Sequence, residues 1–106
     1  MDQFEIWIVS LDPTRGSEMR KTRPAVIVSN SSLNDYLNTV IVAPLTSTIK
    51  DYPFRIDNNF RGKDGQIALD QIRCVDKTRL IEKVGELTDE EEQDVTDILK
   101  LIFEKI

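Results

Sequence analysis

Residues 23–45 read RPAVIVSNSSLNDYLNTVIVAPL, a stretch with two short apolar runs separated by a polar segment. The runs, at residues 25–28 and 40–45, are rich in Val, Ile and Ala and are bounded by Pro and Asn, which is typical of β-strands. Asn30 can cap a short helix over residues 31–37, because its side chain can accept a backbone N–H from the first turn. The stretch therefore predicts a strand, a short helix and a second strand.

Three further apolar runs of the same kind lie at residues 4–11, 67–75 and 80–84. The first contains IWIV at residues 6–9, so apolar side chains point to both faces of that strand. A strand that is apolar on both faces is buried on both sides, as in a tight barrel or a sheet covered by helices.

The last part of the chain has a different pattern. Thr88 and Glu91 form the T-x-x-E pattern of a capping box, and acidic residues fill the first turn, where the helix dipole favours anions. Apolar residues then recur at helical spacing: Val95, Ile98, Leu99, Ile102 and Ile106. We expect a helix over residues 89–105 and interpret the acidic run as its solvated start.

The order of these elements predicts the fold class. Strands cluster early and the long helix comes last, so we expect a mostly β fold with some α: a small, mainly antiparallel barrel with a long C-terminal helix packed on it. From its length of 106 residues we expect one domain, residues 1–106.

Composition excludes several kinds of chemistry. The sequence has no histidine and a single cysteine, Cys74. Histidine-dependent triads, histidine-ligated zinc and an intramolecular disulfide are therefore impossible, and we expect no metal and no cofactor. No apolar run is long enough to span a membrane, the N-terminus carries acids where an export signal carries Lys or Arg, and the lone cysteine fits a reducing compartment. We expect a cytoplasmic protein.

The net charge of −5 is unevenly distributed. Residues 86–106 sum to −6, whereas residues 1–85 sum to +1. Whole-chain acidity is therefore weak evidence against a polyanionic partner.

A basic loop joins the first two predicted strands, over residues 12–22. Arg23 follows it at the start of the next predicted strand. From Arg15 to Arg23 the sequence has four cations and one acid, Glu18; the other cations are Arg20 and Lys21. Such a loop attracts phosphates. The alternative is a solvated turn whose cations offset nearby acids.

Two more features carry polar groups that suit nucleic acids. PLTST at residues 44–48 places three hydroxyls after a predicted strand, where they can donate to a phosphate or simply serve a turn. Gln71 and Arg73 are two residues apart on a predicted strand and so share a face, from which both can read base edges. The alternative is a polar outer strand face.

Three segments carry a resemblance to a known family. LDPTRGSEMRKTRPAVIVSN at residues 11–30, TVIVAPLTST at residues 39–48 and ALDQIRCVDKTRL at residues 68–80, followed by the closing helix, resemble the MazF/PemK-type toxins of bacterial toxin–antitoxin systems. The resemblance spans nearly the whole chain. It departs from the family at Phe4-Glu5, where Gly-Asp is usual, and this alters how the first strand begins.

The resemblance implies a small SH3-like barrel of the CcdB/PemK kind that assembles as a homodimer. It also implies an mRNA interferase, an endoribonuclease that cuts single-stranded RNA at short sequences without metal, and an acidic, partly disordered antitoxin that inserts into the RNA groove. Carried over by position, Arg23, Thr46 and Glu18 are the catalytic candidates. The RNA-binding candidates are Arg15, Gly16, Ser17, Lys21, Ser47, Gln71 and Arg73.

Metal-free cleavage can use the 2′-hydroxyl of the substrate as nucleophile, and the protein then has to move protons and stabilise phosphoryl charge. Arg23 suits charge stabilisation because it is a permanent cation with a planar fork of donors. Thr46 suits positioning by a hydrogen bond. Two roles are open for Glu18. It accepts the 2′-proton, or it forms a structural ion pair with Arg20 or Arg23.

Two other functions remain open from the sequence. A CcdB-type toxin shares this barrel but inhibits DNA gyrase by binding, without catalysis, and fold alone does not separate the two. A third reading is an interaction domain that uses the terminal helix, since Leu101 lies off its main apolar stripe. Among the few aromatic residues we expect Trp7 in the core, and the candidates for base stacking are Tyr36, Tyr52 and Phe54.

Overall fold

The computed structural model describes residues 1–11 and 21–106. The described chain forms seven strands and two α-helices in the order β1 (Glu5–Ser10), β2 (Thr22–Ile27), α1 (Ser31–Tyr36), β3 (Thr39–Thr46), β4 (Arg55–Phe60), β5 (Lys63–Ala68), β6 (Arg73–Asp76), β7 (Leu80–Glu86) and α2 (Asp89–Phe103). Two 3-10 turns, Leu69–Gln71 and Lys77–Arg79, flank β6. No helix among these elements is long and apolar enough to cross a bilayer.

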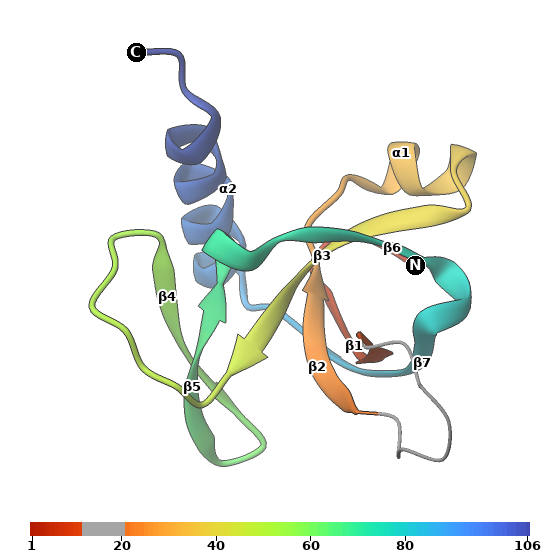
Figure 1. The fold of residues 1–106 in the computed structure, drawn as a ribbon, viewed down its shortest axis with the longest axis horizontal. Helices are drawn as coiled ribbons and strands as arrows, with labels where there is room; N and C mark the ends of the chain where they lie inside the picture. The colour runs from red at the N-terminus through yellow and green to blue at the C-terminus, as the bar shows by residue number, and fades with distance from the viewer. Residues whose placement is uncertain (12–20) are drawn as a thin grey trace.

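The strands form one curled sheet in the order β4-β5-β3-β2-β1-β7. Every ladder between the described strands is antiparallel, and β3 is long enough to pair with β6 near its start and with β5 near its end. Figure 1 shows the sheet curled into an open half-barrel, with α2 standing beside β4 and β5. The expected mostly β fold, an antiparallel barrel with a C-terminal helix, is confirmed.

Two apolar clusters, one on each face of the central strands, hold the sheet together. Val26 packs with Ile67, Leu69 and Val95 of α2 on one face, while the neighbouring Ile27 packs into the other cluster, and all five side chains are fully buried. Strand residues alternate between the two clusters, so these strands are buried on both sides as their continuous apolar runs predict.

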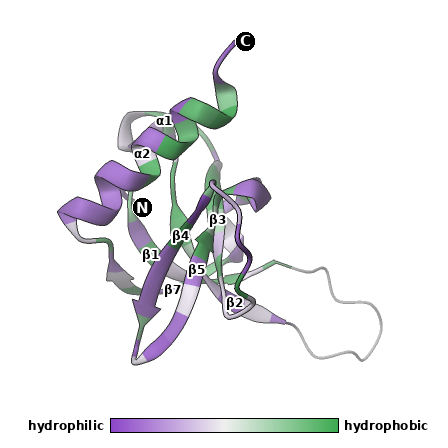
Figure 2. Cartoon of the chain, turned by 90° about the vertical axis from the view of Figure 1, so that its left-hand side faces the viewer, coloured by the Kyte–Doolittle hydropathy of each residue, from purple (hydrophilic) through white to green (hydrophobic). Residues whose placement is uncertain are grey.

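Both helices begin where the sequence predicts. The side chain of Asn30 accepts the backbone N–H of Leu33 at 2.8 Å, and Thr88 and Glu91 form the reciprocal bonds of a capping box. Figure 2 shows α2 changing from hydrophilic in its first turns to largely hydrophobic in its last turns. The helix ends at Phe103, slightly before the expected end at residue 105.

Two features differ from the expected pattern. The predicted strand at residues 67–75 is broken by the 3-10 turn Leu69–Gln71, so Gln71 lies in a turn and does not share a strand face with Arg73. That prediction was wrong. β4 was not predicted from the sequence, because only Ile56 of its six residues is buried and its other residues are largely polar.

Candidate functional site

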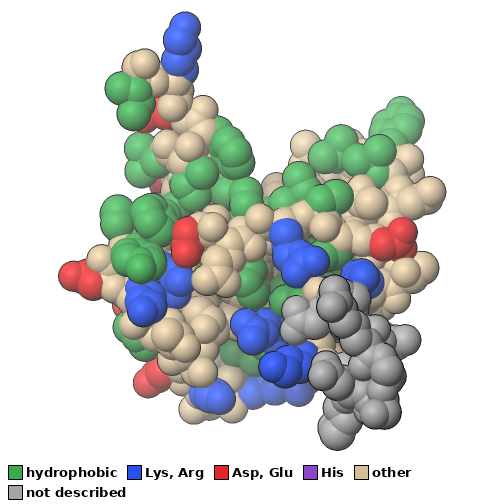
Figure 3. Space-filling view, in the orientation of Figure 1, with side chains coloured by type: hydrophobic (Ala, Val, Ile, Leu, Met, Phe, Trp, Pro, Cys, Tyr) green, Lys and Arg blue, Asp and Glu red, His purple; other side chains and the backbone are tan. Residues whose placement is uncertain are grey.

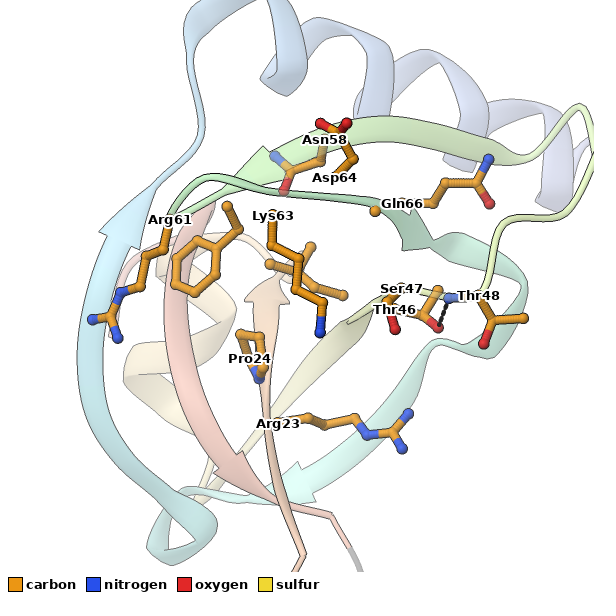
Figure 4. A pocket seen from close by; sticks show the side chains of 13 residues that line it. Arg23, Pro24, Thr46, Ser47, Thr48, Asn58, Arg61, Lys63, Asp64 and Gln66 are labelled. Atoms are coloured by element: carbon orange, nitrogen blue, oxygen red, sulfur yellow. Dashed lines mark hydrogen bonds between the residues drawn. The ribbon is translucent and has the colours of Figure 1, made fainter.

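A pocket of about 490 Å³ opens where β2 begins, β3 ends and the β4–β5 hairpin turns back (Figure 4). Three segments form its walls. They contribute Arg23 and Pro24 from β2; Leu45, Thr46, Ser47 and Thr48 from the end of β3; and Asn58, Phe60, Arg61, Lys63, Asp64, Gly65 and Gln66 from the hairpin.

The sheet register explains why Arg23 and Thr46 line the same pocket. Ala25 of β2 is paired with Pro44 of β3 in an antiparallel ladder. Arg23 lies two residues before Ala25 and Thr46 two residues after Pro44, so both come to the same end of the two strands. Arg23 is exposed, which leaves its guanidinium accessible to a bound molecule. The pocket therefore joins two residues that the sequence analysis proposed as catalytic.

The Thr46 hydroxyl is oriented by the turn that follows β3. Its oxygen accepts the backbone N–H of Thr48 at 3.1 Å. A hydroxyl that accepts one bond still has a proton to donate. Thr46 can therefore donate a hydrogen bond to an anion in the pocket, and Ser47 beside it lines the same wall.

A buried polar network holds this turn in place. The Gln66 side chain, 5% exposed, accepts the Lys50 N–H at 3.0 Å and donates to the Lys50 carbonyl at 3.1 Å. The Arg55 guanidinium donates to the carbonyl of Thr48 at 3.3 Å and forms a two-pronged ion pair with Asp70, at 2.6 and 3.2 Å. These bonds fix the backbone on which Thr46 and its neighbours are placed.

The ion pair between Arg55 and Asp70 makes stability depend on pH. Hydrogen bonds from the Arg55 guanidinium hold the pKa of the Asp70 carboxyl below its usual range. Because folding lowers this pKa, the contribution is complete above about pH 4, the pKa of an unfolded aspartate, and is lost as pH falls through the lower folded value.

We expect Asp70→Asn to lower the free energy of unfolding by about 2–3 kcal/mol at pH 7, because Arg55 is then a buried cation without a carboxylate. The Arg55 side chain is only 3% exposed. Urea unfolding of both proteins at several pH values measures the effect. The difference in the free energy of unfolding between the wild type and Asp70→Asn is expected to shrink below about pH 4. A difference that does not change with pH contradicts this account.

The pocket wall is electropositive. Its lining includes three cations, Arg23, Arg61 and Lys63, and one carboxylate, Asp64. Figure 3 shows Lys and Arg side chains gathered on the lower part of this face, below the apolar side chains of α2. Within residues 1–11 and 21–106 no group of three or more His, Cys, Asp or Glu side chains is arranged to hold a metal ion. The pocket suits an anion such as a phosphate.

The other predicted site residues fall into three groups. Arg15, Gly16, Ser17 and Glu18 lie outside the described residues. Lys21 is exposed immediately before β2, close in sequence to Arg23. Gln71 and Arg73 do not line the pocket, and their proposed contact with bases stays a prediction.

The hairpin residues of the pocket were missed by the sequence analysis. RGK at residues 61–63 places two cations around a glycine, a pattern that marks a basic turn, but β4 before it is too polar to be recognised as a strand. Of the aromatic residues, Phe60 lines the pocket, whereas the three stacking candidates, Tyr36, Tyr52 and Phe54, do not.

Known proteins resemble this chain over nearly its whole length. A family model described as PemK-like, MazF-like toxin of type II toxin–antitoxin system matches residues 2–103. The chain belongs to this toxin family. The chain is 35% identical over 107 residues to the endoribonuclease MazF of Staphylococcus saprophyticus, a match that covers 95% of this chain and 89% of that protein.

Solved structures show the same fold. The crystal structure of MazF (form I) from Deinococcus radiodurans is similar to this MazF-like toxin with a TM-score of 0.80 and 24% identity, covering 99% of this chain and 97% of that one. An endoribonuclease in complex with its cognate antitoxin, from a mycobacterial species, gives a TM-score of 0.79 and 22% identity, covering 95% and 92%. The half-barrel with its terminal helix is thus the fold of these toxins.

Proposed function

We propose that this toxin is an endoribonuclease that cleaves single-stranded RNA without a metal ion. The observation that carries the proposal is that Arg23 and Thr46 line the same pocket. The 35% identical relative from Staphylococcus saprophyticus is named an endoribonuclease, which supports the same activity for this chain.

In the proposed reaction the 2′-hydroxyl of the RNA attacks the neighbouring phosphorus and the 5′-oxygen leaves. The leaving 5′-oxygen takes up a proton from water, so the products are a 2′,3′-cyclic phosphate on one fragment and a 5′-hydroxyl on the other. Arg23 stabilises the negative charge that develops on the phosphoryl oxygens, because two of its N–H groups can donate to them at once. Thr46 donates to a phosphoryl oxygen and holds the phosphate against Arg23.

Proton transfer needs a further group. A guanidinium is a poor general base, so Arg23 is not our candidate for accepting the proton. Glu18 is our candidate for accepting the 2′-proton, with an ion pair to Arg20 or Arg23 as its alternative role. Arg15, Lys21 and Ser47 are proposed to hold phosphates beside the scissile one.

The proposal includes the partners that the family implies. We propose that the toxin acts as a cytoplasmic homodimer and is inhibited by an acidic antitoxin that occupies the same electropositive surface. The negative charge of such a segment complements the three cations of the pocket. A gyrase poison of the CcdB type is less favoured, because a protein that acts by docking has no need of an arginine and a hydroxyl joined in one pocket.

Incubating the purified toxin with a labelled RNA oligonucleotide in excess chelator tests the function. We expect cleavage to persist, because the scheme stabilises charge with side chains and uses the hydroxyl of the substrate as nucleophile. Mass spectrometry of the fragments is expected to find a 2′,3′-cyclic phosphate. Loss of cleavage in chelator, or a 5′-phosphate on the product, contradicts the proposal and indicates attack by an activated water.

A further inference from the structure

The β4–β5 hairpin forms a second basic wall of the pocket. Its tip, defined here as residues 60–63, contributes Phe60, Arg61 and Lys63 to the lining. Figure 4 shows the Lys63 side chain extending into the pocket, with its amine on the side where Pro24 and Thr46 lie, while Arg61 turns outward. One cation of the hairpin tip therefore lies inside the pocket and the other at its rim.

The backbone conformation of the hairpin tip is unfavourable for Arg61. Phe60 pairs with Lys63, so Arg61 and Gly62 form a two-residue turn, and both have positive φ, 53° and 79°. Such a turn favours Asn or Gly at its first position, because a larger side chain is strained there. An arginine at this position is an outlier of the kind that often accompanies a functional role for the side chain.

The hairpin tip is also preformed. The Asn59 side chain accepts the Gly62 N–H at 3.1 Å and donates to Asp64 at 2.8 Å. The Arg61 guanidinium lies over the Phe60 ring, with its central carbon 5.1 Å from the ring centre. Among the described residues neither Arg61 nor Lys63 forms a salt bridge, so the charge of both is available to an anionic ligand.

We propose that the hairpin tip is a second phosphate-binding subsite for RNA. Lys63 binds the phosphate next to the scissile one, and Arg61 binds a phosphate further along the strand, at the rim. The inference rests on the proposed function and extends it. The hairpin tip binds the RNA on the side of the pocket opposite Arg23 and Thr46. It acts through binding and takes no part in the chemical step.

Binding of a non-cleavable RNA oligonucleotide with 2′-deoxy nucleotides tests the subsite by fluorescence anisotropy at several salt concentrations. We expect Lys63→Gln to raise Kd about tenfold and to reduce the slope of log K against log salt by about 0.7, the value for one lost phosphate contact on a single strand. The matched control is Lys100→Gln, at an exposed position on α2 outside the pocket, and it is expected to bind like the wild type.

Arg61→Gly separates a binding role from a structural one. Glycine relieves the positive φ, so we expect an equal or higher melting temperature together with weaker RNA binding. In cleavage assays both hairpin variants are expected to raise KM and to leave kcat within about twofold, because the lost contact is remote from the reacting phosphate. If both variants keep the Kd and the salt dependence of the wild type, the proposed subsite is overturned and the proposed function is not. If the wild-type protein neither binds nor cuts RNA, the proposed function itself is overturned.

Discussion

Replacing Arg23 by alanine is expected to lower the rate of RNA cleavage about a thousandfold, because the variant loses the donor that stabilises charge on the phosphoryl oxygens. The side chain is exposed at the start of β2 and belongs to neither apolar cluster. We therefore expect the melting temperature to change little. Cleavage rates under single-turnover conditions, measured with thermal melts of both proteins, test the effect.

Two further variants sharpen this test. Arg23→Lys keeps the charge but loses the two-pronged fork, so we expect it to restore only part of the activity. Lys100→Ala removes one charge at a distance from the pocket and controls for a general effect of net charge. Undiminished cleavage by a folded Arg23→Ala protein contradicts the role assigned to Arg23.

Gly65→Ala is expected to damage both the fold and the site. A Cβ atom at Gly65 would lie 2.5 Å from the backbone carbonyl oxygen of Thr46, closer than a Cβ atom can approach another heavy atom without a clash. Since both partners are strand backbone, β3 and β5 have to separate, and we expect a loss of about 2–3 kcal/mol in the free energy of unfolding. The same movement displaces Thr46, so cleavage by the remaining folded protein also falls.

Gly85→Ala is the matched control for this prediction. A Cβ atom at Gly85 would meet only side-chain atoms of Ile6 and Phe60, at 3.8 and 3.9 Å, which is ordinary contact. Urea unfolding is expected to leave the stability of this variant within about 1 kcal/mol of the wild type. Equal stabilities of the two alanine variants contradict the tight approach between Gly65 and Thr46.

The parts of the fold that the sequence predicted are those with strong local signals. The capping box of Thr88 and Glu91, the cap at Asn30 and four of the Val- and Ile-rich runs each predicted an element that the structure contains. These four runs lie at residues 4–11, 25–28, 40–45 and 80–84. β4 has no such signal. It pairs along its whole length with β5, and that long-range pairing, which no local pattern reveals, makes a polar segment a strand.

The site was predictable in part for the same reason. Arg23 and Thr46 flank two apolar runs that pair as neighbouring strands, so an antiparallel sheet brings them to one end. The hairpin tip enters the pocket only because β4 and β5 fold back beside β3, and Lys63 was therefore missed. Gln71 was misplaced because residues 67–75 were predicted as one strand, whereas the 3-10 turn Leu69–Gln71 interrupts this segment.

The central claim is that Arg23 and Thr46 act on one phosphodiester whose own ribose supplies the attacking oxygen. An RNA oligonucleotide with a single 2′-deoxy nucleotide at a mapped cut site tests this most directly. The account predicts that the toxin binds this oligonucleotide with a Kd within about twofold of the all-ribose strand but does not cut it at the modified position. Cleavage at that position at the rate of the unmodified RNA would contradict the account.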